Sequence, residues 1–69
     1  MMDDLKLEMI DEARVKAMEK YNTTDISPIG ERESFDECFT IDEDTLIFWF
    51  EIDIECGRTS CIVMRDLPA

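Results

Sequence analysis

Three cysteines and many carboxylates are the side chains of this chain that could do chemistry, and histidine is absent. A catalytic thiol needs a neighbouring base or positive charge that stabilises the thiolate. Cys56 is the one candidate because it lies close to Arg58, but the surrounding carboxylates disfavour its thiolate. Because histidine is absent, a zinc site would have only the thiolates of Cys38, Cys56 and Cys61 as nitrogen or sulfur ligands. We expect no zinc site. We therefore predict structural cysteines and no catalytic residue.

The acidic run Asp42, Glu43 and Asp44 is the candidate calcium site. Calcium takes about six to eight oxygens, and the twelve-residue EF-hand pattern with its central Gly and final Glu is absent here. The run is better explained as an exposed turn.

Paired carboxylates could also act as acid and base, but only in a concave, partly dry pocket that separates their pKa values. A domain this small offers little room for one, so we predict no enzyme, no cofactor and no metal.

The net charge argues against several classes of partner. The chain carries 18 acidic and 7 basic side chains, for a formal net charge of −11. Such a charge repels nucleic acid and anionic lipid, so we expect no direct nucleic-acid binding and no membrane attachment. The opening MMDDLKLEMIDE lacks the basic start and apolar stretch of a signal peptide. An odd number of cysteines leaves at least one thiol unpaired in the monomer, which favours a reducing compartment. These features predict a cytoplasmic protein.

The length and hydrophobic content predict one small folded domain over residues 1–69. The hydrophobic fraction of 45% is too high for intrinsic disorder, although 36% of the residues are charged. A domain of this size buries only about 60% of the surface that its unfolded chain exposes. Its stability therefore needs support from a disulfide, a metal or a partner subunit.

Residues 3–21 are expected to form an amphipathic helix, because they contain no Gly or Pro and are rich in helix formers. On a helical projection one broad face carries Leu7, Met9, Ile10, Ala13, Ala17, Met18 and Tyr21. Carboxylates occupy the opposite face, where Val15 fits poorly. Residues 22–34 contain Pro28 and Gly30 among small polar residues, and we expect them to form a connecting loop.

Three strands are predicted at residues 35–41, 46–55 and 59–66. The first is ambiguous, because SFDE at 34–37 also matches a capping box that would begin a helix. The alternation of Phe35, Phe39 and Ile41 with polar residues favours a strand.

Two turns set the predicted strand register. A turn centred on Glu43 and Asp44 places Phe39 opposite Phe48. A two-residue turn at Cys56 and Gly57 pairs Phe50 with Val63, Ile52 with Cys61 and Trp49 with Met64.

The predicted fold is α+β, with the N-terminal amphipathic helix packed on a three-stranded antiparallel β-meander whose central strand is 46–55. The inner face is expected to carry Phe39, Ile41, Leu46, Phe48, Phe50, Ile52, Ile54, Cys61 and Val63. The helix covers this face and forms the core with it.

The outer face of the same sheet is the candidate functional surface, because Ile47, Trp49, Ile62 and Met64 lie on it together. A solvated sheet face normally alternates to polar residues. An apolar centre with a charged rim is typical of an interaction surface, and Trp and Met are enriched at such surfaces. The alternative is that residues 22–34 fold over the sheet and make Trp49 part of the core.

The leading functional hypothesis is a non-enzymatic protein-interaction module that forms a homodimer through this outer face. The last strand is also a sheet edge that could pair with another edge. The alternative hypothesis is an acidic inhibitor or antidote, of a phage or plasmid type, that binds a basic surface on a larger protein. Such an inhibitor could mimic the charge of a nucleic-acid backbone, and its binding would be fast and salt-sensitive.

Overall fold

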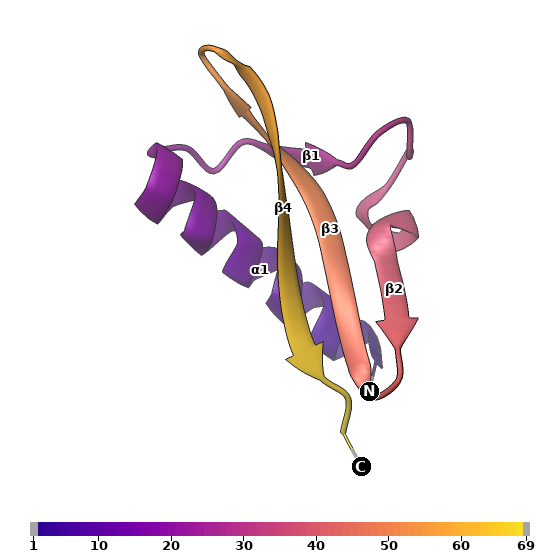
Figure 1. Ribbon diagram of the computed structural model, residues 1–69. Helices are drawn as coiled ribbons and strands as arrows, with labels where there is room; N and C mark the ends of the chain where they lie inside the picture. Colours follow the sequence, from indigo (N-terminus) through magenta and orange to yellow (C-terminus); the bar gives the residue numbers. More distant parts are fainter. Residues whose placement is uncertain (1, 69) are drawn as a thin grey trace.

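The computed structural model describes residues 2–68, and Figure 1 shows a helix packed against a sheet. The elements in chain order are α1 (Met2–Tyr21), β1 (Ile26–Pro28), the 3₁₀ helix η1 (Phe35–Cys38), β2 (Phe39–Asp42), β3 (Thr45–Ile54) and β4 (Gly57–Asp66). The predicted α+β class and the antiparallel sheet are confirmed. Within the described residues the sheet has four strands, where the sequence predicted three.

Helix α1 buries a narrow stripe against the sheet. Met9, Ala13 and Ala17 are fully buried, and the short alanine side chains let the helix lie close to β3 and β4. The broad apolar face predicted for this helix is wrong at Leu7 and Met18, which are exposed. Leu5, Ile10 and Tyr21 beside the stripe are half-buried against the core, and the apolar side chains farther from the sheet stay in water.

Strand β3 is the centre of the sheet. β4 pairs with its whole length on one edge, while β2 and β1 share the other edge, as Figure 1 shows. The predicted turn at Glu43 and Asp44 and the predicted pairing of Phe39 with Phe48 are confirmed. Glu43 adopts a φ of 55° at the first turn position, where hairpin turns with positive φ usually have Gly or Asn.

Strand β1 corrects the prediction that residues 22–34 are a loop throughout. Ile26 pairs with Ile52, and Pro28 with Phe50, beside the second half of β3. A Pro is tolerated here because β1 is an edge strand. Side-chain contacts hold the segment in place, since the Ser27 hydroxyl donates to Asp53 at 2.9 Å and the Gly30 N–H donates to Glu51 at 2.9 Å.

The 3₁₀ helix η1 corrects the first half of the strand predicted at 35–41. The Glu37 carboxylate accepts hydrogen bonds from the backbone N–H groups of Glu33 at 2.8 Å and Ser34 at 3.2 Å. These contacts satisfy N–H groups that the first helical turn leaves unpaired. Local capping therefore prevails over the apolar alternation, and the strand begins only at Phe39.

The turn between β3 and β4 lies one residue earlier than predicted. Ile54 is opposite Gly57, so the two turn residues are Glu55 and Cys56. Gly57 follows them with a φ of 131°, a conformation that residues with a Cβ rarely adopt. The glycine is therefore required at the start of β4 rather than inside the turn.

This earlier turn changes the predicted pairs but keeps every side chain on its predicted face. Phe50 pairs with Cys61 in place of Val63, Ile52 pairs with Thr59 in place of Cys61, and Trp49 pairs with Ile62 in place of Met64. Moving a two-residue turn by one position shifts the pairing by two residues, which is the period of a strand.

The core lies between α1 and the inner face of the sheet. Its fully buried side chains are Met9, Ala13, Ala17, Cys38, Leu46, Phe48, Phe50, Ile52 and Val63. Phe48 is central, because its ring stacks on Phe39 and Phe50 at centroid distances of 4.6 and 5.2 Å. The expectation that Ile41 belongs to this core is wrong, since 55% of it is exposed. α1 packs mainly on β3 and β4, and Ile41 on β2 lies beside that contact.

Candidate functional site

The four predicted interface residues lie together on the sheet face that α1 does not cover. Ile47 is directly opposite Met64, and Trp49 is directly opposite Ile62, so the residues form two consecutive cross-strand pairs. We call these four side chains the outer patch. Trp49 is 40% exposed, Ile62 38% and Met64 54%. The structure places these residues in one group, and their role as an interface remains a prediction.

The segment after β1 lies against one side of Trp49 and leaves 40% of this residue exposed. Ile29, Arg32 and Trp49 line a cavity of about 250 Å³ together with residues of η1 and β2. Residues 22–34 thus lie at the side of the indole, and their strand β1 extends the sheet edge. The covered arrangement, in which this segment makes Trp49 a core residue, is not the one observed.

Charged side chains border the patch at both ends. At the hairpin end, the Arg58 guanidinium on β4 lies 2.7 Å from Asp53 and 3.8 Å from Glu51, both on β3, and neutralises part of their charge. At the other end, Asp42 and Asp66 are exposed and flank Thr45 in the same cross-strand row. The rim is therefore partly neutralised at one end and acidic at the other.

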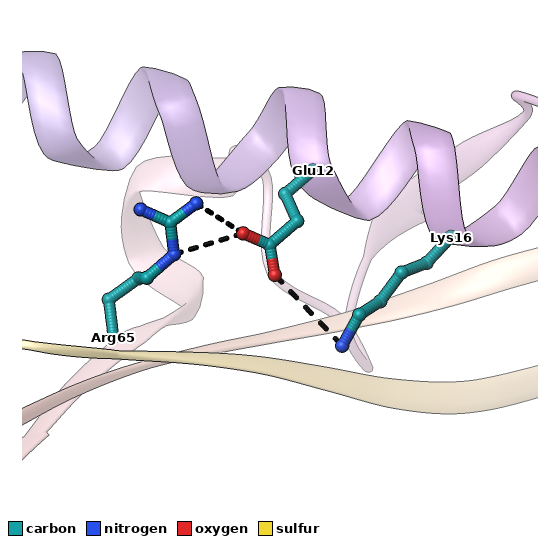
Figure 2. Close-up of polar contacts among 3 residues, drawn as sticks. All are labelled: Glu12, Lys16 and Arg65. Carbon is teal, nitrogen blue, oxygen red and sulfur yellow. Dashed lines mark hydrogen bonds and ion pairs between the residues drawn. The ribbon is translucent and has the colours of Figure 1, made fainter.

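An ion pair on the inner side of the sheet fixes β4 to the helix, as Figure 2 shows. Arg65 donates to Glu12 through Nε at 2.9 Å and also through Nη2, and Lys16 lies 4.0 Å from the other oxygen of Glu12. The hydrogen bond that Arg65 donates to Glu12, reinforced by the negative charge of this carboxylate, raises the pKa of Arg65. This contact positions β4 beneath the helix and leaves the outer face of the strand free.

The remaining candidate chemistry is dispersed over the fold. Cys38 is buried, Cys61 is half-buried and Cys56 is exposed in the hairpin turn, and all three thiols are free. Within residues 2–68, no three Cys, Asp or Glu side chains gather closely enough to hold a metal ion. No helix in this part of the chain is long and apolar enough to cross a membrane.

The prediction of one apolar surface outside the core missed a second one on α1. Leu7, Val15 and Met18 are all exposed, and Val15 and Met18 border an open, mostly apolar depression with Thr24. The misfit of Val15 among the carboxylates of the helix was the signal in the sequence. Val15 and Met18 lie on the side of the helix away from the sheet, while Leu7 lines a separate depression with Ile10 and Phe39, so none of the three belongs to the outer patch.

Comparison of the chain with protein-family models, with curated proteins and with solved structures finds no match. The function is therefore inferred from the surface of the molecule itself. The outer patch is the part of that surface in which apolar side chains from two strands meet within a charged border.

Proposed function

We propose that this chain is a small, acidic, non-enzymatic interaction module of the cytoplasm that self-associates through its outer patch. The observation that carries the proposal is the partial exposure of Trp49, Ile62 and Met64 as neighbours on one sheet face. Exposed apolar area with a charged rim favours a protein partner that removes it from water. Three free thiols support a reducing compartment.

A second copy is the favoured occupant because the chain needs additional burial. A domain of 69 residues has a small core, and association is a common way to complete one. An isologous contact lets the same patch serve both copies, so no second apolar surface is required. Trp49 is expected to dominate the energy of that contact, because hot spots concentrate in central aromatic residues.

The acidic border supports the second candidate, a basic surface on a larger protein. Asp42 and Asp66 lie exposed at one end of the outer patch, and the net charge of the chain is −11. Complementary charge speeds such binding and makes it sensitive to salt. In this role the module is an inhibitor or antidote that occupies the basic surface of its target.

The fluorescence of Trp49 tests self-association through the outer patch, because it is the sole tryptophan. We expect the emission to move to shorter wavelength as protein concentration rises, together with an increase in mass measured by light scattering. Trp49→Ala removes about 2 kcal/mol of contact energy and weakens the association about 30-fold. Met18→Ala is the matched control, since Met18 is similarly exposed on the far side of α1 and should leave the association unchanged. An emission maximum that is independent of concentration would refute the proposal.

A further inference from the structure

The open edge of β4 is a second surface, and its hydrogen-bonding groups can be assigned from the register. The N–H of Leu67 donates to the carbonyl of Asp44 at 2.7 Å, and the N–H of Asp53 donates to the carbonyl of Asp25 at 3.1 Å. Backbone groups alternate in direction along a strand. Even-numbered residues of β3 therefore bond to β4, and their partners in β4 are odd-numbered. The even-numbered residues of β4 point their N–H and C=O groups away from β3.

These outward groups belong to Arg58, Ser60, Ile62, Met64 and Asp66, whose side chains lie on the outer face of the sheet. Among the described residues, β3 is the strand that pairs with β4, and no strand occupies the opposite edge. The edge is thus ten residues long, well above the usual strand length of about five to six. Long open edges are templates for pairing with another strand.

The sequence of this edge is complementary to itself in one register. A two-fold axis perpendicular to the sheet at Ile62 places a second β4 antiparallel to the first, with equivalent faces on the same side. Arg58 then lies opposite Asp66 of the second copy, and Ser60 lies opposite Met64. Because of the two-fold symmetry, one Arg58–Asp66 charge pair forms at each end of the contact. The inner-face pairs, Cys61 with Val63 and Thr59 with Arg65, oppose no like charges.

Neighbouring registers lose this complementarity. Centring the axis on Cys61 places Arg58 opposite Met64, and centring it on Val63 places Arg58 opposite Pro68. Opposite charges across an antiparallel pair stabilise it by about 0.2–1 kcal/mol each. We propose that β4 pairs with β4 of a second copy about a two-fold axis at Ile62, which joins the two sheets into one.

This contact differs from the outer-patch contact and does not depend on it. It joins the two sheets edge to edge, with both helices on one side and both outer patches on the other. Trp49 lies on β3, one strand away from the joined edges, so its indole stays exposed in this dimer. Edge pairing therefore gives no shift in Trp49 emission, whereas outer-patch association gives one.

Cysteine cross-linking measures the register. The background carries Trp49→Ala, which weakens outer-patch association through the face that also holds Ile62, together with Cys56→Ser and Cys61→Ala, and it keeps Cys38, which is buried. In the proposed register Ile62 faces Ile62 of the second copy, with Cα atoms about 5.5 Å apart, a distance that a disulfide can span. We expect Ile62→Cys to form covalent dimers under mild copper-catalysed oxidation.

Single variants at flanking positions are the matched controls. In the proposed register, residue 60 of one copy is offset by about four strand positions from residue 60 of the other, and the same holds for residue 64. The Cα atoms are then roughly 13 Å apart, so neither Ser60→Cys nor Met64→Cys can form a disulfide with the same residue of the second copy. Neither should cross-link alone, but a mixture of the two should. Cross-linking of Ser60→Cys alone, or its absence in Ile62→Cys, would overturn the proposed register.

A charge substitution provides an independent test in the Trp49→Ala background, where outer-patch association is weakened about 30-fold. Asp66→Lys places two like-charge pairs against Arg58 and should weaken the dimer about tenfold in sedimentation equilibrium. Asp42→Lys changes the net charge equally at the far end of the same cross-strand row. Asp42 is on β2, away from the joined edges, so Asp42→Lys should weaken the dimer less than Asp66→Lys does. Equal affinities for the two variants would contradict the pairing of Arg58 with Asp66.

Discussion

Phe48 and Trp49 are adjacent in the chain, but they lie on opposite faces of β3 and in different environments. Phe48 is fully buried against three other phenylalanine rings, with Phe35 edge-on at 5.7 Å and Phe39 and Phe50 stacked. Trp49 faces outward beside Ile62. The alternation of a strand thus assigns one aromatic ring to folding and makes the next available for contact with another molecule.

This difference predicts unequal effects on the free energy of unfolding. Phe48→Leu removes ring contacts from a packed core and should cost about 2 kcal/mol. Trp49→Phe keeps an aromatic ring on a partly solvated face and should cost less than about 1 kcal/mol. Urea unfolding at low protein concentration, where the chain is monomeric, measures both values. A Trp49→Phe cost as large as that of Phe48→Leu would place the indole in the core.

At the scale of the elements, the β3–β4 hairpin depends on the backbone conformation of Gly57. A Cβ added there would meet no atom within 4 Å, so any loss of stability on substitution comes from the φ of 131° alone. Gly57→Ala should cost about 1–3 kcal/mol. Gly30 is the control, because its φ of 63° lies in the left-handed region that Asn also adopts. Thermal unfolding should show a much smaller loss for Gly30→Asn, and equal losses would mean that Gly57 is not strained on substitution.

The elements were predictable from sequence to different degrees, and each error has a local cause. The helix and the alternation of β3 depend on long periodic patterns, which predict α1 and the face of Trp49 correctly. The register of β4 depends on the position of Gly57 relative to the turn, and a glycine inside the turn gives the same sequence signal as a glycine directly after it. Strand β1 is three residues long and is held by side-chain contacts to Glu51 and Asp53, which no local pattern reveals. At η1 the same residues match both the apolar alternation of a strand and the capping box of a helix. The hydrogen bonds to Glu37 stabilise the helical turn, so the strand begins only after it.

The candidate site was predictable because it follows from the parity of β3 and β4 rather than from their exact register. The pairing moved by two residues, yet Ile47, Trp49, Ile62 and Met64 still lie on one face. What the sequence could not supply was the position of residues 22–34 relative to Trp49. That position depends on the pairing of Ile26 and Pro28 with β3, which is a long-range contact.

At the scale of the whole molecule, the protein is a thin slab. Its principal dimensions are 40 × 25 × 17 Å, and the smallest matches one helix layer on one sheet layer. One face of the sheet therefore has a helix against it, and the other has no second layer from the described residues (Figure 1). A partner on the outer patch would add that layer and would remove the exposed indole from water.

Net charge opposes self-association, and this gives a prediction that separates the two candidate functions. Each copy carries −11, so two copies repel each other at low ionic strength, where screening extends over about 30 Å at 0.01 M salt. Raising the salt to about 0.5 M should therefore strengthen self-association on the order of tenfold, measured by the concentration midpoint of the Trp49 emission shift. A variant with Asp3→Asn and Asp4→Asn, both on the exposed start of α1, should show a weaker salt dependence without contacting the patch. Binding to a basic target should instead weaken as salt rises, because screening then removes attraction. A chain that stays monomeric at every salt concentration, and binds a basic partner only at low salt, would favour the inhibitor over the self-associating module.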